Sequence, residues 1–128
     1  MIEEGIKGEA KVSVGEDNTA QAMCSGGLPV FATPAMSALM EKACFDSVEP
    51  LMENGKSTVG TYIEVHHVSA TPKGKEVTAE SILTAVDGRR LKFTVKAYDD
   101  GGIIGDAVHE RVIIDVEKFL TKAQSKRT

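Results

Sequence analysis

The most constraining feature of this sequence is one long amphipathic segment, followed by strand-like patterns almost to the end of the chain. The segment covers about residues 34–53 and begins at Thr33-Pro34, where Thr is a good N-cap and Pro fits the first helical turn. Asn54-Gly55 supplies a helix stop. Apolar residues recur at helical spacing on one broad arc, namely Met36, Leu39, Met40, Ala43, Cys44, Val48, Leu51 and Met52. The pattern therefore predicts one long helix with a single face to bury.

The stretches on either side of this helix predict β-strands and a short final helix. Strands are expected over Lys7–Glu16, Ser57–Ala70, Glu76–Val86, Leu91–Tyr98 and Ile103–Val116, and a helix over Val116–Ala123. Turns with Gly or Pro separate the last four strands, so successive antiparallel hairpins are the simplest topology. We expect an α+β domain in which an antiparallel sheet of about five strands packs on the long helix. Such a sheet leaves edges that dimerisation commonly covers.

Composition narrows the class of protein. The 128 residues fit one domain, and 41% apolar with 27% charged residues fits a globular chain. A net charge of −4 with scattered basic residues argues against nucleic-acid binding. No apolar run is long enough to span a membrane, and the acidic start is unlike a signal peptide, so we expect a cytoplasmic protein. Two cysteines without a histidine pair predict neither a disulfide framework nor a metal site.

Two polar side chains of the predicted helix are functional candidates, because a buried polar group costs free energy unless it is paired. Glu41 falls on the flank of the apolar arc, away from the charged face. The alternative is a boundary glutamate whose carboxylate reaches water. Thr33 stands at the helix start, where unpaired N–H groups can stabilise an oxyanion, although an ordinary N-cap explains it equally well. Eight residues separate the two, roughly 12 Å of helical rise, so direct contact requires the helix start to bend inward or a substrate to lie between them.

His67 is the third candidate. Alternation along the predicted strand places it on one face with Val59, Ile63 and Val65, and turns His66 to the other face. A core histidine bonded to a backbone carbonyl is the alternative, and a bulge would exchange the two faces.

Other polar features are weaker signals. His109 and Arg111 share a face of the last strand, as part of an ion-pair ladder or as ligand contacts. Arg89-Arg90 after a turn indicates a solvated edge or a phosphate contact. Gly26-Gly27 indicates a flexible loop within residues 18–29.

Several motifs occur in a fixed order along the chain. They are Phe31-Ala32-Thr33-Pro34, Leu39-Met40-Glu41-Lys42-Ala43-Cys44, Gly60-Thr61, His67-Val68-Ser69-Ala70-Thr71-Pro72, Asp87-Gly88-Arg89-Arg90-Leu91 and His109-Glu110-Arg111. On these motifs the chain resembles the hotdog-fold thioesterases, specifically the fluoroacetyl-CoA thioesterase-like family. The resemblance implies a single hotdog domain over residues 1–128, with its core at about 8–116 and a short helix and polar tail over 117–128.

The resemblance also implies the site. Thr33, Glu41 and His67 match the family's catalytic positions, and we expect Gly60, Arg111 and Gly27 to contact substrate. It further implies a homodimer with joined sheets, in which acyl-CoA lies near the interface and each site draws on both chains. Neither a cofactor nor a metal is expected, because coenzyme A is part of the substrate. Arg111 ranks first among the basic residues that could hold the CoA phosphates, the others being Lys73, Lys75, Arg89 and Arg90.

The expected activity is hydrolysis of an acyl-CoA thioester. Glu41 would activate water or attack the acyl carbon, His67 would polarise the carbonyl or manage the proton, and Thr33 would orient Glu41 or the acyl group. The loop over residues 24–29 has no aromatic side chain, whereas a lid selective for a very small acyl group needs bulk. We therefore expect a short-chain or small aromatic acyl group rather than fluoroacetyl selectivity. The alternative is a non-catalytic acyl-CoA-binding or regulatory dimer, and no separate hydratase motif is present.

Overall fold

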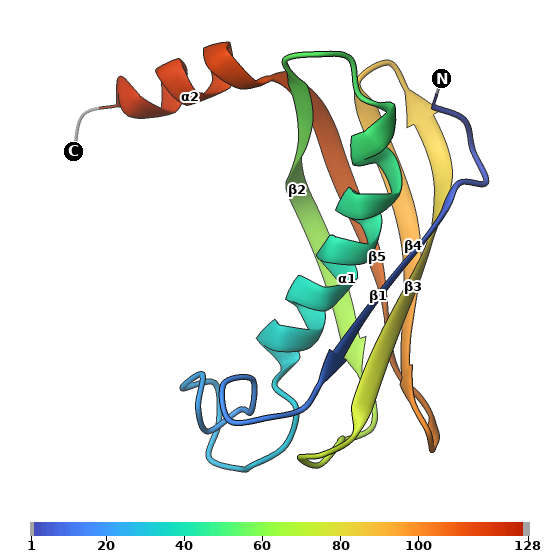
Figure 1. Cartoon of the computed structure of the whole chain (residues 1–128), viewed down its shortest axis with the longest axis vertical. Coiled ribbons are helices and arrows are strands. Elements are labelled where there is room, and N and C mark those ends of the chain that lie inside the picture. Colours follow the sequence, from blue (N-terminus) through green and yellow to red (C-terminus); the bar gives the residue numbers. More distant parts are fainter. Residues whose placement is uncertain (1, 127–128) are drawn as a thin grey trace.

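A computed structural model describes residues 2–126, and Figure 1 shows a curled sheet with one long helix against its concave face. The elements in chain order are β1 (Lys7–Ser13), α1 (Thr33–Val48), a 3-10 turn η1 (Glu49–Leu51), β2 (Lys56–His67), β3 (Glu76–Asp87), β4 (Arg90–Asp99), β5 (Gly102–Asp115) and α2 (Val116–Gln124). Five strands form one antiparallel sheet in the order β1-β3-β4-β5-β2. The predicted α+β hotdog architecture is confirmed.

The core lies between α1 and the sheet. Within α1 the predicted apolar arc is buried and forms one core cluster with side chains of the sheet, whereas Leu51, which the prediction also placed on this arc, lies in η1 and is 42% exposed. Close packing also needs Gly8 on β1, because a Cβ there would collide with the backbone carbonyl of Ala43 in α1. Fully buried members from the sheet are Val77, Ala79, Leu83, Phe93 and Ala97.

The predicted series of successive hairpins is wrong at one link. β3, β4 and β5 are joined as hairpins, but β2 pairs with β5 at the opposite edge from β1 and does not pair with β3. The segment over residues 68–75 crosses from one side of the sheet to the other and is held by Thr71, whose hydroxyl donates to Asp99 at 2.8 Å. Its Gly and Pro mark a change of direction, and a turn signal does not say which strands pair.

Both predicted ends of the long helix need correction. The α-helix ends at Val48 and continues only as the 3-10 turn, because Pro50 has no N–H to donate and its ring clashes with the preceding turn. At the other end, the N-cap is Ala32 and no side chain caps the helix, so Thr33 is not the predicted N-cap. The Thr33 hydroxyl is therefore free for another partner.

A bulge in β2 exchanges the faces of that strand. The β2–β5 register shifts between residues 60 and 62. Before the bulge, Thr58 is buried, so the prediction that Val59 shares the inward face is wrong. After the bulge, the odd positions turn inward, and His67 points toward α1 as predicted, whereas His66 is exposed beside Asp106 at 3.1 Å.

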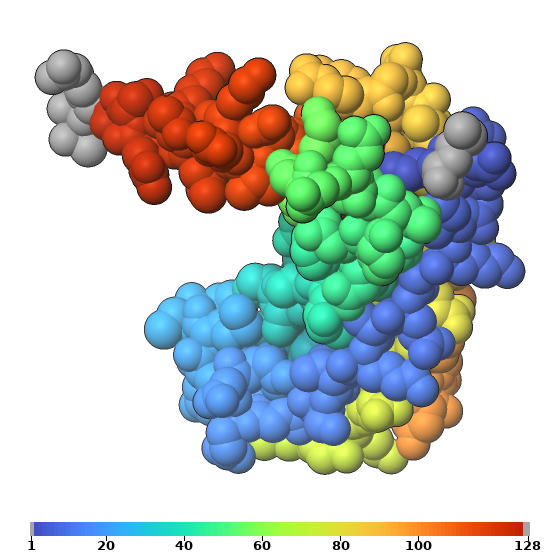
Figure 2. Space-filling view, turned by 45° about the horizontal axis from the view of Figure 1, so that its top comes forward, coloured from blue at the N-terminus to red at the C-terminus, as the bar shows by residue number. Residues whose placement is uncertain are grey.

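The predicted C-terminal helix is present as α2. It projects from the body of the molecule, and Figure 2 shows the surface hollowed between α2 and the loop that precedes α1. Phe119 and Leu120 are 41% and 49% exposed on this helix. No helix of the described chain is long and apolar enough to cross a membrane. Residues 127–128 of the predicted tail lie outside the described residues.

Candidate active site

Thr33 and His67 form a pair at the start of α1. Thr33 is the first residue of the helix, and His67 is the last residue of β2. The Thr33 Oγ1 and His67 Nδ1 atoms lie 2.8 Å apart. The structure thus brings together two of the three predicted catalytic residues, from segments that are 34 positions apart in the sequence.

His67 presents a free ring nitrogen. Its Nε2 atom is buried and has no hydrogen-bond partner among the described residues. Burial lowers the pKa of His67 below its usual 6.5, with the backbone near Ser69 acting in the opposite direction. A pocket of about 300 Å³ opens beside the pair, lined by side chains from 20–33 and 67–70. A neutral imidazole therefore borders a cavity with unused hydrogen-bonding capacity.

Glu41 lies apart from this pair. It stands eight residues after Thr33 on the same helix, and its side chain is 42% exposed. Its Oε2 atom lies 4.0 Å from His109 Nε2 on β5. Within one chain the three predicted catalytic residues thus form two separate groups.

Gly60 makes room for the Glu41 carboxylate. A Cβ at Gly60 would lie 3.0 Å from Glu41 Oε2, 3.0 Å from His109 Cε1 and 3.4 Å from Arg111 Nη1. Glycine at this point of β2, directly before the bulge, lets the three polar groups converge on its backbone.

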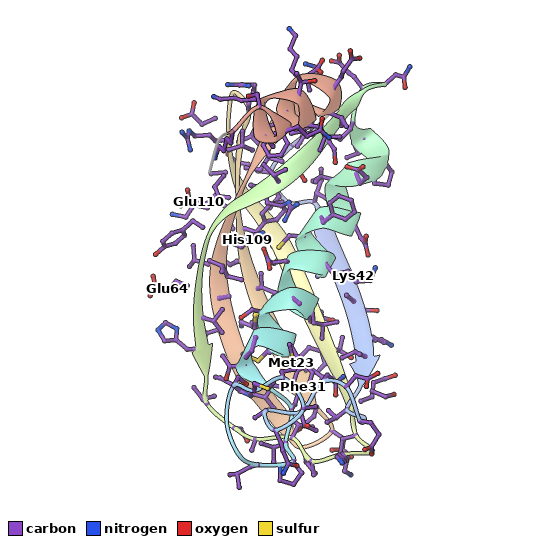
Figure 3. The ribbon with its side chains drawn as sticks, turned by 90° about the vertical axis from the view of Figure 1, so that its left-hand side faces the viewer. Met23, Phe31, Lys42, Glu64, His109 and Glu110 are labelled. Atoms are coloured by element: carbon purple, nitrogen blue, oxygen red, sulfur yellow. The ribbon has the colours of Figure 1, made fainter. Side chains whose placement is uncertain are left out.

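Arg111 and His109 are both buried. Figure 3 shows His109 between the sheet and α1, whereas Glu110 and Glu64 point outward. Arg111 is 7% exposed and donates to the Thr58 hydroxyl at 2.8 Å and to the Thr58 carbonyl at 3.0 Å. Its Nη1 lies 3.1 Å from His109 Nε2, and its guanidinium lies 5.4 Å from the centre of the Phe45 ring.

Sequence reasoning singled out these two residues but missed their burial and their proximity to Glu41. Their alternation with inward-facing residues of β5 was the available signal. The Arg111 guanidinium makes its hydrogen bonds to Thr58 and His109 inside the protein. This position differs from that of a surface arginine that binds phosphate.

The other predicted binding residues lie at the surface. Gly27 is exposed, and no described atom lies within 4 Å of a Cβ built on it. Lys73 and Lys75 are paired with carboxylates at 3.3 and 2.9 Å. Arg89 and Arg90 are exposed at the β3–β4 turn without an ion pair in the described part of the chain.

Cys44 follows Glu41 by three residues and is fully buried. Burial raises the pKa of this thiol to about 12. A thiol with that pKa is not ionised at neutral pH, so Cys44 does not supply a nucleophile.

The burial of His109 predicts a pH-dependent stability. Burial lowers the pKa of this fully buried imidazole, with Tyr62, Arg111 and Glu41 facing it, so the folded state favours the neutral form. The contribution of His109 to the free energy of unfolding is complete above about pH 6.5 and is lost as the pH falls through its lowered pKa. The free energy of unfolding then changes by at most about 1.4 kcal/mol per pH unit. Urea unfolding at pH 7.5 and pH 5.0 should show that acidification lowers the free energy of unfolding less in His109→Phe than in wild type. Equal losses would contradict the expectation.

The strand order and the curled sheet around one helix define a hotdog-fold protein. A solved structure of a Thermus thermophilus thioesterase superfamily member is similar, with a TM-score of 0.89 and 28% identity over 97% of this chain and 92% of that chain.

Closer comparisons identify the family. The family model described as fluoroacetyl-CoA-specific thioesterase matches residues 14–117. A fluoroacetyl-CoA thioesterase from Streptantibioticus cattleyicolor is 45% identical over 97 residues, which are 76% of this chain and 70% of that protein. A solved structure of a fluoroacetyl-CoA thioesterase has a TM-score of 0.92 and 36% identity, covering 100% of this chain and 99% of the other. The chain belongs to the fluoroacetyl-CoA-specific thioesterase family, which confirms the resemblance and the predicted class, thioester hydrolase.

Proposed function

We propose that this chain hydrolyses short-chain or small aromatic acyl-CoA thioesters to the free acid and CoA, using Thr33, Glu41 and His67. The observation that carries the proposal is the Thr33–His67 contact of 2.8 Å, which holds an imidazole that lines a pocket and whose Nε2 atom is buried without a hydrogen-bond partner among the described residues. The relatives named above as fluoroacetyl-CoA thioesterases support the reaction class.

In this proposal the pair stabilises the oxyanion. The Thr33 hydroxyl donates to His67 Nδ1, so Nε2 of the neutral ring carries the proton. Nε2–H then donates to the thioester carbonyl oxygen, and this hydrogen bond strengthens as negative charge develops on that oxygen. The lowered pKa of His67 supports a neutral ring at physiological pH.

Glu41 supplies the attack. As a base, its carboxylate takes a proton from water while the water oxygen bonds to the acyl carbon; as a nucleophile, its own oxygen forms that bond and water later cleaves the acyl-enzyme. In both versions the C–S bond breaks, CoA leaves as thiolate and then takes up a proton. The reaction needs only water and these side chains, without a cofactor.

Glu41 and Thr33 are roughly 12 Å apart along one helix, so the three proposed catalytic residues do not meet within one chain. A homodimer could bring Glu41 of one chain to the Thr33–His67 pair of the other. The edge strand β2 has 12 residues, no Pro and a single lysine at its first position, Lys56, whereas the other edge strand, β1, has 7 residues and carries two lysines. Long unprotected edges favour pairing with another strand. Antiparallel pairing of two β2 strands would set helices of both chains side by side, with the partner in the hollow beside α2 that Figure 2 shows.

Light scattering coupled to gel filtration tests the dimer. We expect a mass near twice the 13.7 kDa of one chain. A monomer with full thioesterase activity would contradict it.

The loop before α1 indicates which size of acyl group the site would prefer. Its tip is exposed and carries Met23 and Leu28 but no aromatic side chain, so it lacks the bulk to enclose a two-carbon acyl group. We therefore propose preference for butyryl-sized or phenylacetyl-sized acyl groups over fluoroacetyl.

Free thiol release from acetyl-, fluoroacetyl-, butyryl- and phenylacetyl-CoA tests the function directly. Thr33→Val removes the hydroxyl at almost constant volume, and kcat should fall by about 10- to 100-fold because the imidazole loses its orientation. Thr33→Ser keeps the hydroxyl and is the matched control, with kcat close to wild type. Tight binding of acyl-CoA without thiol release from any of the four would favour the regulatory alternative.

A further inference from the structure

The strongest unexplained feature is the imidazole of His109, fully buried beside Glu41. Its ring has 0% relative exposure and stacks on Phe93 with the ring centroids 6.2 Å apart. Both ring nitrogens have partners, Nδ1 with the Tyr62 carbonyl at 2.8 Å and Nε2 with Arg111 Nη1 at 3.1 Å. The proposed reaction assigns this residue no part.

The partners of His109 fix its protonation. A backbone carbonyl only accepts, so Nδ1 must carry the proton that it donates to Tyr62. A guanidinium only donates, so Nε2 must be the unprotonated acceptor. The two contacts together are compatible with one state alone, the neutral ring with its proton on Nδ1.

The bulge in β2 makes this arrangement possible. The register shifts between residues 60 and 62, so the Tyr62 carbonyl is turned to accept from a side chain of β5. On the other side of the shift, Gly60 leaves the space into which Glu41, His109 and Arg111 converge. One irregularity of the strand thus positions both the acceptor for His109 and the room for the carboxylate.

Three hydrogen bonds hold the Arg111 guanidinium in the interior. Thr58 accepts two, through its hydroxyl and its carbonyl, and His109 accepts the third. The third is made by Nη1, which would lie 3.4 Å from a Cβ at Gly60, where Glu41 Oε2 would lie at 3.0 Å. Without the His109 acceptor, Nη1 would lose its partner, and the guanidinium could turn about the Thr58 contacts.

We propose that His109 is a positioning residue for thioester hydrolysis: as a neutral acceptor it fixes the Arg111 guanidinium beside the Glu41 carboxylate and so orients that carboxylate toward substrate. The inference rests on the proposed function of Glu41. Glu41 Oε2 lies 4.0 Å from His109 Nε2, and the Glu41 side chain is 42% exposed, so the carboxylate borders the buried His109–Arg111 pair on one side and stays accessible on the other. Misorientation of a catalytic group by about 1 Å can cost about 100-fold in rate.

Nitrogen-15 NMR of the histidine rings tests the protonation state without reference to activity. The chain has three histidines, and His66→Gln and His67→Gln variants assign their signals. We expect His109 to be neutral with its proton on Nδ1 at pH 7. A proton on Nε2, or on both nitrogens, would overturn the proposal.

A pair of variants tests the positioning role. His109→Phe keeps an aromatic ring against Phe93 but removes the acceptor, so kcat should fall by about 10- to 100-fold with KM within about twofold. His109→Gln offers an amide oxygen to Arg111 and an amide N–H to Tyr62, and it should recover most of the loss. Thermal unfolding of both variants accompanies the kinetics.

The outcomes separate the two hypotheses. If wild type releases no thiol, the proposed function fails. If wild type is active and a folded His109→Phe retains wild-type kcat, the positioning role fails alone. Equal loss in both variants at equal melting temperature would also overturn it, because restoring the acceptor would then have no effect.

Discussion

Replacing Glu41 by Gln is expected to abolish thioester hydrolysis while the fold survives. The amide has nearly the shape of the carboxylate, and the Glu41 side chain is 42% exposed, so the free energy of unfolding should change by less than about 1 kcal/mol. An amide neither takes a proton from water nor attacks an acyl carbon at neutral pH. We therefore expect kcat to fall by about 1,000-fold or more, as measured by thiol release from the best substrate.

Asp46→Asn is the matched control for Glu41→Gln. It makes the same chemical change on the same helix at the same 42% side-chain exposure, but its carboxylate faces Lys42 at 2.8 Å. An exposed ion pair contributes little, so both stability and kcat should stay close to wild type. Equal activity of Glu41→Gln and Asp46→Asn would remove Glu41 from the mechanism.

The sequence predicted the elements of this fold better than their connections. Each predicted strand and both helices exist, because hydrophobic periodicity is a local signal. The pairing of β2 with β5 depends on packing around α1, which brings together segments far apart in the sequence. The turn residues between β2 and β3 do not indicate which strands pair. The end of α1 at Val48 was readable, since Pro50 removes a helical donor, but the continuing apolar pattern outweighed it.

For the site, the sequence predicted candidate residues but not their grouping. The direction of His67 was right although the strand phase was wrong at Val59, because the bulge after Gly60 restores the inward face for the later residues. Hydrophobic periodicity does not predict such a bulge, although Gly60 within the strand is a weak indication of one. The contacts of His109 and Arg111 depend on that bulge, so alternation along the last strand predicted only that the two side chains share a face, as an ion-pair ladder or as ligand contacts.

The second large effect is expected for His67→Ala. The substitution removes the nitrogen proposed to donate to the carbonyl oxygen and leaves the Thr33 hydroxyl without its 2.8 Å partner. Loss of one such donor costs about 100- to 1,000-fold in kcat. His66→Ala is the control, because the neighbouring imidazole is exposed on the other face beside Asp106 and should leave thiol release within twofold of wild type. Equal kcat for the two alanine variants would exclude His67 from the reaction.

The pH dependence of the rate gives the His67 prediction its sign. Burial lowers the pKa of His67 from 6.5, so the ring is neutral at and above that pH and becomes an imidazolium only in more acidic solution. A protonated Nδ1 no longer accepts from Thr33, and the pair loses the geometry that the proposal requires. Ionisation of His67 should therefore leave kcat/KM unchanged near pH 7. The value of kcat/KM should fall as the pH drops through the lowered pKa of His67. A rate that rises on acidification through this range would show that the imidazolium is the active form, and the residue would then act as an acid rather than as a neutral donor.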